Sequence, residues 1–277
     1  MSRKEKEEPV FERYRVPTNK KKISLGDFDS RDKSCFPDRD AAEIQTAEDI
    51  QAIAELQNRL YAEDRQALLI VLQATDTGGK DSTIRKVLGP INPQGVRVTS
   101  FKAPSKRELA HDYLWRIHQA TPEKGMIGVF NRSHYEDVLI VRVHGLAPKD
   151  DVEQRYDQIN DFERHLSDNH TTILKFFLHI SKDEQRERLQ ARLDDPSKHW
   201  KFNPGDLKER EHWRDYEDAF EIALSRCSTR YAPWFVIPAD RKWYRNAVIA
   251  RIVRRTLEDM APQYPTVDFD PKSIVID

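Results

Sequence analysis

The stretch from residue 67 to residue 83 constrains the fold of this chain more than any other. It begins with an uninterrupted run of branched apolar residues, Leu68 to Leu72, which predicts a buried strand. A short loop with Gly78, Gly79 and Lys80 follows, and then a helical segment. This order is typical of a phosphate-binding loop, because glycines let backbone N–H groups approach phosphate oxygens while the helix start and the lysine supply positive charge.

The loop departs from the standard pattern G-x-x-x-x-G-K-[ST] in ways that suggest a metal ion. Ala74 stands in place of the first glycine, and Asp81 stands where a hydroxyl that binds Mg²⁺ is expected. Asp76 adds a carboxylate inside the loop, and a carboxylate beside phosphates is repelled unless a cation lies between them. We therefore expect Asp76 to bind Mg²⁺, or Mn²⁺ in its place. The alternative is an ordinary Asp-Thr-Gly-Gly turn between strand and helix.

Strand and helix patterns alternate along most of the chain. The expected strands cover residues 67–73, 96–101, 126–131, 172–179 and 234–238. The expected helices cover residues 47–64, 79–88, 105–119, 150–168, 182–193, 206–227 and 240–260. The alternation predicts an α/β fold in which helices cover both faces of a parallel sheet and the ligand binds beyond the carboxyl ends of the strands.

The two ends of the chain lack this alternation. Residues 1–46 are polar and irregular and contain the basic run Lys20–Lys22, so we expect an N-terminal arm that lies on the body or on a partner subunit. Residues 47–265 then form the folded domain, and residues 266–277 form a C-terminal tail.

The charge balance limits the kinds of partner. The chain has 46 Lys and Arg residues against 47 Asp and Glu residues, a net charge of -1, which argues against a protein that coats nucleic acid. Any anion site must then be a local cluster of cations. The sequence shows no stretch like a membrane span and no start like a signal peptide. Cys35 and Cys227 are expected to be reduced thiols of a cytoplasmic protein.

A second polar cluster follows the third predicted strand. Asn131 ends that strand at the position where a phosphate enzyme commonly places a metal-binding carboxylate. Glu136 and Asp137 come about one helical turn later, and Arg132 can clamp a phosphate. The alternative is a helix start, capped by Asn131 or Ser133, with solvated charges after it.

A third cluster predicts a lid over the phosphates, at about residues 182–214. Arg188 and Arg192 are four residues apart, so both point from one helix face. Pro196 ends that helix, and a loop with further cations follows it. These cations are Lys198 and Lys201. Lids of this kind exclude water and bring arginines to developing charge. The alternative is a solvated face, since the segment also carries many acidic residues.

With these clusters in order, the chain resembles the polyphosphate kinase 2 family from about residue 20 to residue 265. The similarity is closest to the class III branch, which phosphorylates both nucleoside monophosphates and diphosphates. The motifs that carry it are Asp76-Thr-Gly-Gly-Lys80-Asp, Thr83-Ile-Arg85-Lys86, Phe101-Lys-Ala-Pro104, Phe130-Asn-Arg-Ser-His-Tyr-Glu136-Asp137, Asp195-Pro-Ser-Lys-His-Trp-Lys-Phe-Asn-Pro204, Ala232-Pro-Trp234 and Ala239-Asp-Arg-Lys-Trp-Tyr-Arg245.

The resemblance implies a three-layer α/β/α sandwich like that of thymidylate kinases, a phosphate-loop kinase with a five-stranded sheet and a helical lid. It also implies a Mg²⁺-dependent and reversible transfer of the terminal phosphate of inorganic polyphosphate to AMP or ADP. Other branches have an aspartate where Asn131 stands, which moves the expected metal role to Asp76. We further expect a homo-oligomer, a dimer or a tetramer, with no nucleic-acid or membrane partner.

The implied roles divide the candidate residues into three sets. The catalytic set is Asp76, Lys80, Arg132, Arg188 and Arg192. The phosphate-binding set is Gly78, Gly79, Lys86, Lys102, Lys106, Lys198 and Lys201. The nucleotide-binding set is Asn131, Glu136 and Asp137. Two alternatives remain open at this point: a nucleoside monophosphate kinase that uses ATP, and a non-catalytic module that binds phosphate polymers or nucleic acid.

Overall fold

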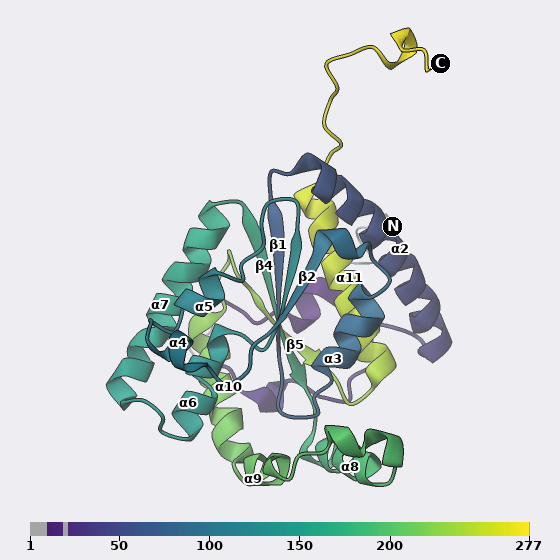
Figure 1. Cartoon of the computed structure of the whole chain (residues 1–277). Coiled ribbons are helices and arrows are strands. Elements are labelled where there is room, and N and C mark those ends of the chain that lie inside the picture. Colours follow the sequence, from purple (N-terminus) through teal and green to yellow (C-terminus); the bar gives the residue numbers. More distant parts are fainter. Residues whose placement is uncertain (1–9, 19–21, 277) are drawn as a thin grey trace.

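The computed structural model describes residues 10–18 and 22–276, so Lys20 and Lys21 lie outside the described residues. Parallel strands in this part of the chain form one five-stranded sheet in the order β2-β3-β1-β4-β5 (Figure 1). The strands are β1 (Ala67–Gln73), β2 (Val96–Ser100), β3 (Ile127–Asn131), β4 (Thr171–His179) and β5 (Trp234–Pro238). Each lies within one residue of its predicted bounds, which confirms the predicted parallel sheet.

Strand β1 shows why the fold has three layers. All of its residues are buried. Leu68, Ile70 and Leu72 belong to one hydrophobic core, and Leu69 and Val71 belong to the other. Successive side chains of a strand point to opposite faces, so a strand that is apolar throughout needs helices on both sides.

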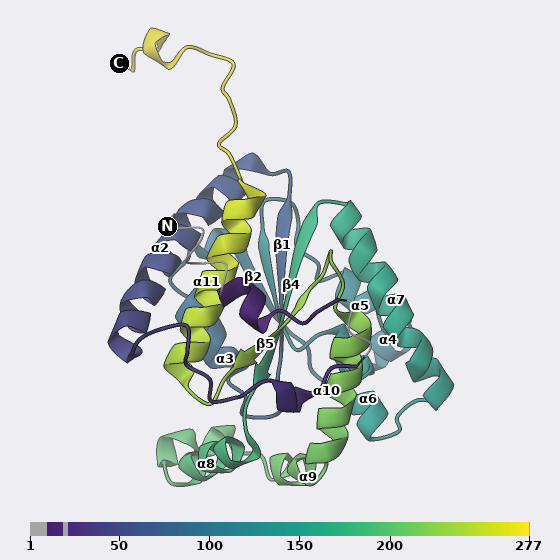
Figure 2. The same cartoon turned by 180° about the vertical axis from the view of Figure 1, so that it is seen from behind.

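The helices cover the two faces of the sheet (Figures 1 and 2). One layer contains α2 (Arg39–Glu63), α11 (Lys242–Met260) and α3 (Lys80–Thr83), which continues as a π-helix over Ile84–Leu88. The other contains α4 (Lys106–Leu109), α5 (Trp115–His118), α6 (Ile140–Val143), α7 (Lys149–Asp168) and α10 (Trp213–Cys227). This three-layer sandwich confirms the predicted fold class.

Two predicted helices in the first half of the chain differ from those in the structure. Helix α2 begins at Arg39 rather than at residue 47, because the Asp38 side chain caps it by accepting a bond from the Ala41 N–H at 2.8 Å. The predicted helix 105–119 is two short helices, α4 and α5. Asp112 interrupts it by accepting a bond from the backbone N–H of Leu114 at 2.9 Å, a local bond that competes with the helix.

The predicted helix 206–227 is also divided, at His212, into α9 (Gly205–Glu211) and α10. The two halves pack against different parts of the molecule. Helix α9 has no buried residue, whereas α10 buries Phe220, Leu224 and several neighbours in the core. One straight helix could not lie over the end of the sheet and also pack along its face.

The described part of the N-terminal arm lies on the body. Residues 10–14 are helical, and the Val16 N–H donates to the Trp234 carbonyl at 2.8 Å. Arg15 forms an antiparallel bridge with Phe235, so the arm covers the outer edge of β5 (Figure 2). The tail after α11 extends away from the body at the opposite end of the molecule from α8 and α9 (Figure 1). Among the described helices, none combines the length and the apolar character that crossing a membrane requires.

Candidate active site

The glycine loop adopts a conformation that depends on its two glycines. It follows β1 and ends at α3. A Cβ atom on Gly78 would lie 2.4 Å from the Cβ of Ala74. Gly79 has φ +103°, a left-handed value that glycine adopts without strain, and Thr77 has φ 62°, which is unusual for a β-branched residue. Such local strain is often found at functional sites.

Lys80 occupies the first turn of α3, directly after the glycines. Its Nζ donates to the Ala74 carbonyl at 3.2 Å, so the side chain folds back over the loop. Burial lowers the pKa of Lys80, and the nearby charge of Arg132 lowers it further, whereas Asp76 and Glu136 oppose the shift. The site thus holds a compact group of cations and carboxylates around the loop.

Arg132 begins the turn after β3 and is the centre of this group. Its φ of 63° is left-handed, and its N–H donates to the Leu72 carbonyl at 3.1 Å, so the turn is fixed to the end of β1. The guanidinium reaches Asp76 at 3.1 Å and Glu136 at 3.5 Å. Parallel strands β1 and β3 pair Leu72 with Asn131, and this register brings the two loops together.

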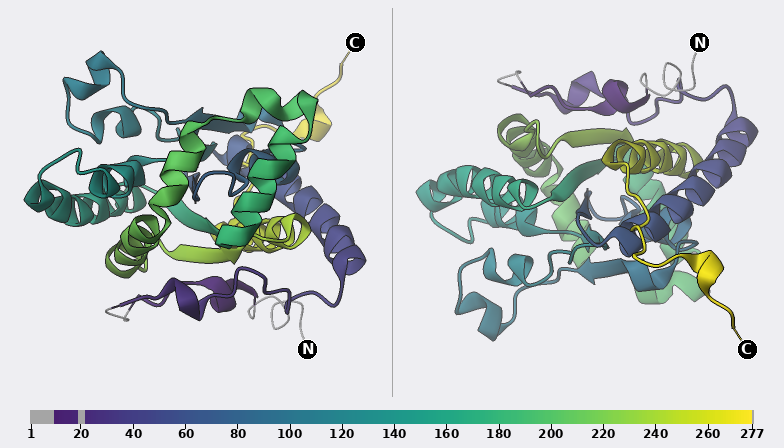
Figure 3. Two further views of the ribbon diagram at one scale, coloured as in Figure 1. Left: turned by 90° about the horizontal axis from the view of Figure 1, so that it is seen from below. Right: turned by 90° about the horizontal axis from the view of Figure 1, so that it is seen from above.

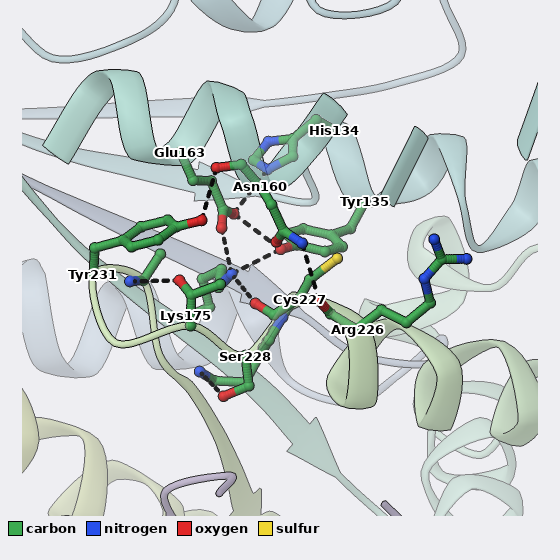
Figure 4. Close-up of polar contacts among 12 residues, drawn as sticks. His134, Tyr135, Asn160, Glu163, Lys175, Arg226, Cys227, Ser228 and Tyr231 are labelled. Atoms are coloured by element: carbon green, nitrogen blue, oxygen red, sulfur yellow. Dashed lines mark hydrogen bonds and ion pairs between the residues drawn. The ribbon is translucent and has the colours of Figure 1, made fainter. Parts of the chain in front are cut away.

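A buried polar network supports the turn from behind (Figure 4). Lys175 Nζ donates to the Tyr135 hydroxyl at 2.8 Å and also pairs with Glu163. Glu163 in turn accepts bonds from the Tyr135 hydroxyl at 2.9 Å and from His134 at 3.1 Å. All four side chains are at most 1% exposed. Because His134 and Tyr135 directly follow the Arg132–Ser133 segment, the network restricts where Arg132 can lie.

The predicted lid covers the carboxyl end of the sheet (Figure 3, left). It consists of α8 (Lys182–Leu193), a short 3₁₀ helix (Pro196–Lys201) and α9. Helix α8 is docked on the loop, because Gln185 Nε2 donates to the Asp76 carbonyl at 3.0 Å. Arg188 donates to the carbonyls of Thr77 at 3.0 Å and Ala239 at 2.6 Å. Arg188 therefore braces the loop against the end of β5.

Loop, sheet end and lid enclose a basic groove of about 860 Å³. The cations that line it are Lys80, Arg85, Lys102, Arg132, Arg188, Arg192, Lys198, Lys201 and Lys242. Its carboxylates are Asp76, Asp81 and Asp206. Nine cations against three carboxylates make it a site for a polyanion, and this local excess reconciles an anion site with the near-zero net charge.

A smaller pocket of about 240 Å³ lies beside the groove, between the loop, α6, α9 and α10. Its carboxylates are Asp76, Glu136, Asp206 and Glu209, and Arg132 is its single Lys or Arg among the described residues. Apolar side chains line the rest. They include Leu139, Ile140, Trp213 and Phe220. Glu209 is held in place by the Tyr216 hydroxyl at 2.6 Å and by His144 at 2.9 Å.

The groove and the pocket meet at Asp76, Arg132 and Asp206, which line both. Asp206 belongs to the lid and pairs with Arg192 at 3.2 Å. Burial raises the pKa of Asp206, and the nearby Asp76 raises it further. A group bound in the pocket can therefore meet a polyanion in the groove at a junction that already contains both signs of charge.

Most of the residues predicted for the site line these two cavities. Those in the groove are Asp76, Gly78, Gly79, Lys80, Lys102, Asn131, Arg132, Arg188, Arg192, Lys198 and Lys201. Glu136 lines the pocket. Asn131 donates to Asp81 at 2.6 Å and so orders the start of α3.

Three predicted residues lie elsewhere. Lys86 and Lys106 are exposed and line neither cavity. Asp137 is also outside both, paired with Arg155 at 3.5 Å, and burial raises the pKa of Asp137 to about 6. The predicted segments reach the two cavities, but the sequence could not say which side of each segment faces them.

Several residues that line the cavities were not among the predicted site residues. They are Arg85, Lys242, Asp206, Glu209 and Tyr216. Lys242 follows the end of β5, so the rule that ligands bind beyond the carboxyl ends of parallel strands could have found it. Asp206 and Glu209 lie in a lid segment of balanced charge, in which nothing distinguishes them from solvated residues.

The carboxylates fit a loosely held divalent cation rather than a closed metal centre. No group of three or more His, Cys, Asp and Glu side chains in the described ranges could hold a metal. Asp76 uses one carboxylate oxygen toward Arg132. Its other oxygen accepts no hydrogen bond from the described residues, and Asp206 lies in the same junction. Mg²⁺ commonly binds one or two carboxylates and takes its other ligands from water and phosphates, so this donor set fits it.

The parallel sheet, the glycine–lysine loop at its end and the arginine-bearing lid define a phosphate-loop kinase. Comparison with known proteins agrees. The model of the polyphosphate kinase 2 family matches residues 37–265, and the chain belongs to this family.

Similar proteins cover nearly the whole chain. An AMP/ADP-polyphosphate phosphotransferase of Meiothermus ruber is 51% identical over 268 residues, which span 96% of this chain and 100% of that protein. An ADP-polyphosphate phosphotransferase of Rhodopseudomonas palustris is 43% identical over 88% of this chain and 89% of its own length. The crystal structure of polyphosphate kinase 2 from Arthrobacter aurescens TC1 superposes with a TM-score of 0.92 at 45% identity, covering 95% of this chain and 94% of that one.

Proposed function

We propose that this protein transfers the terminal phosphate of inorganic polyphosphate to AMP and to ADP, reversibly and with Mg²⁺. The observation that carries the proposal is the junction at Asp76, Arg132 and Asp206, where a basic groove and a smaller, partly apolar pocket meet. The polyphosphate occupies the groove, and the nucleoside part of the acceptor occupies the pocket. The names of the relatives in Meiothermus ruber and Rhodopseudomonas palustris support this choice of substrates.

The groove favours polyphosphate over a single nucleoside triphosphate as the donor. Its cations extend from Lys80 on the loop to Lys198 and Lys201 on the lid, and a chain with a charge at every phosphorus can contact all of them. An ATP-dependent nucleoside monophosphate kinase remains the alternative. It would need fewer cations in the groove and a second pocket for the base of its donor.

The chemistry requires positioning and charge rather than a general base. The attacking oxygen belongs to the acceptor phosphate, which is already ionised near neutral pH because its second pKa is about 6. Lys80 and the backbone N–H groups of the glycine loop hold the transferring phosphate. Arg132 lies where the phosphate passes from groove to pocket and can bind the charge that develops on it. The docked lid excludes water, which would otherwise compete as acceptor.

Asp76 is the residue that would hold Mg²⁺, and Asp206 lies close enough to share the same junction. When bound, the cation neutralises phosphate charge next to the loop carboxylate. The pairing of Asp76 with Arg132 at 3.1 Å keeps the carboxylate oriented toward the junction.

We also propose that the chain works as a homo-oligomer, a dimer or a tetramer, in the cytoplasm. The C-terminal tail supports the proposed oligomer, because it extends from the body with several large apolar side chains exposed. These are Tyr264, Val267, Phe269, Ile274, Val275 and Ile276. Covering them against a second copy would be favourable. Deletion of residues 262–277 should then lower the molar mass measured by light scattering, and an unchanged mass would exclude this contact. The two free thiols support the proposed location in the cytoplasm.

One assay tests the function directly. Purified protein with polyphosphate, AMP and Mg²⁺, and no ATP at the start, should form ADP and then ATP. Product formation that requires added ATP as the donor would favour the alternative kinase, and binding without turnover would favour the non-catalytic module.

A further inference from the structure

Arg245 is a buried cation directly behind the glycine loop. It lies on α11, is 0% exposed, and belongs to neither cavity lining. Its guanidinium lies against Gly79, because a Cβ atom built on Gly79 would come within 2.0 Å of Arg245 Nη1. The absence of a side chain at Gly79 therefore lets the guanidinium approach the backbone that is expected to cradle phosphate.

The charge of Arg245 has no carboxylate partner within the described chain. Its hydrogen bonds go to neutral oxygens: the Ser82 hydroxyl at 3.0 Å and the Asn246 side chain at 2.9 Å. Nη1 makes no hydrogen bond to any residue that the structure describes. Burial lowers the pKa of Arg245 to about 9, and the nearby charge of Arg188 contributes, yet the group remains charged at neutral pH.

Other cations increase the imbalance. Burial lowers the pKa of Lys242, and the charges of Arg188 and Arg245 lower it further, whereas Glu184, which pairs with Arg188 at 2.7 Å, opposes the shift. A buried cation that lacks a partner is costly, and its field is poorly screened because little water lies between it and the loop. Such an arrangement is unfavourable in the free protein and becomes favourable when an anion arrives.

A second buried arginine on the same helix, Arg254, differs from Arg245 because its charge is paired with carboxylates. Arg254 is 4% exposed, and its guanidinium pairs with Asp49 at 2.9 Å and with Glu258 at 2.9 Å. Arg254 therefore has its countercharges within the protein, whereas no described carboxylate pairs with Arg245.

We propose that Arg245 is an electrostatic positioning residue of the glycine loop, whose countercharge is the phosphate chain bound on the other side of Gly79. The inference rests on the proposed function, since it takes polyphosphate as the anion in the groove. It goes further, because Arg245 does not line the groove and acts through the loop rather than by contact. The free protein then holds an uncompensated charge that polyphosphate binding relieves.

The test uses Arg245→Met, which keeps most of the side-chain volume, with Arg254→Met as the matched control. Polyphosphate binding is measured by calorimetry without acceptor, and unfolding is measured with and without polyphosphate. We expect Arg245→Met to bind polyphosphate about tenfold more weakly, with a shallower salt dependence. We also expect the free variant to unfold at a higher temperature than wild type, because an unpaired buried charge is gone. Arg254→Met should do the reverse: unfold earlier and bind polyphosphate as wild type does.

Arg245→Lys should restore part of the affinity, since it keeps the charge. Unchanged affinity of Arg245→Met, or a free variant that is less stable than wild type or does not fold, would overturn the proposal and make Arg245 a packing residue. These results are separate from a failure of the proposed function. In that case the wild-type protein itself would neither bind polyphosphate nor turn it over.

Discussion

The groove and the pocket share three residues and yet differ in charge and size. The groove has a large excess of cations and a volume of about 860 Å³, whereas the pocket has four carboxylates, one arginine and a volume of about 240 Å³. In the proposed function the long polyanion occupies the first and the nucleoside occupies the second. The difference indicates that one loop can serve two substrates because the lid divides the space above the sheet into regions of opposite character.

The largest expected effect comes from Lys80, the loop lysine that lines the groove. Lys80→Ala should lower turnover about 10²- to 10³-fold with either AMP or ADP, because it removes a charge that binds the transferring phosphate. Steady-state kinetics with polyphosphate measures this fall in turnover. Lys86→Ala is the matched control, since Lys86 lies nearby on the following π-helix but is exposed and outside the groove. Equal activity of the two variants would exclude the phosphate-loop role.

Asp76 tests the boundary between the two regions. Asp76→Asn keeps the size of the side chain but removes the charge that a hard cation needs, so turnover should fall about 10- to 100-fold and more Mg²⁺ should be required. A Mg²⁺ titration of activity measures both. The control is Asp81→Asn, because Asp81 lines only the groove and pairs with Asn131. A wild-type titration curve for Asp76→Asn would move the metal role to another carboxylate, with Asp206 the first to test.

The sequence predicted the sheet and the groove better than the pocket. Strands such as β1 are continuous apolar runs, and a glycine loop followed by lysine is a local signal, so both can be found without knowing what they contact. The pocket is assembled from separate elements. Glu209 from the lid forms hydrogen bonds with Tyr216 of α10 and with His144 after α6, and no local sequence pattern predicts these contacts.

The arginines of the lid show the same limit in another form. Their spacing correctly predicted that Arg188 and Arg192 share a side, and both line the groove. Spacing could not show that Arg188 would donate to the carbonyls of Thr77 and Ala239, because these belong to the loop and to the segment directly after β5. Arg188 therefore has a bracing role that the prediction of a direct phosphate contact did not contain.

A pair of lid variants should separate the two regions through their substrates. Arg192→Gln should raise the KM for polyphosphate several-fold and make it less sensitive to salt, because a charge is lost from the groove and screening acts over about 8 Å. The KM for AMP should stay close to that of wild type. Glu209→Gln should show the opposite, a raised KM for AMP with little change for polyphosphate. If both variants change the same substrate, the groove and the pocket are not separate sites.

The smallest effect on activity is expected at Asp137, and it tests whether the pocket ends where the structure places it. Burial raises the pKa of Asp137 to about 6 from an ordinary 3.8, so the folded protein holds this proton more tightly than the unfolded chain does. The resulting stabilisation is complete below about pH 4 and is lost as the pH rises through about 6. Asp137→Asn does not titrate. The free energy of unfolding of this variant relative to that of wild type, measured by urea denaturation, should therefore rise by about 1–3 kcal/mol between pH 4.5 and pH 7.5.

The KM values of Asp137→Asn for AMP and polyphosphate should not change, because Asp137 lines neither cavity. A raised KM for AMP would extend the pocket to Asp137 and restore the nucleotide role that its sequence position suggested, and parallel stability curves would mean that the carboxylate is already ionised against Arg155.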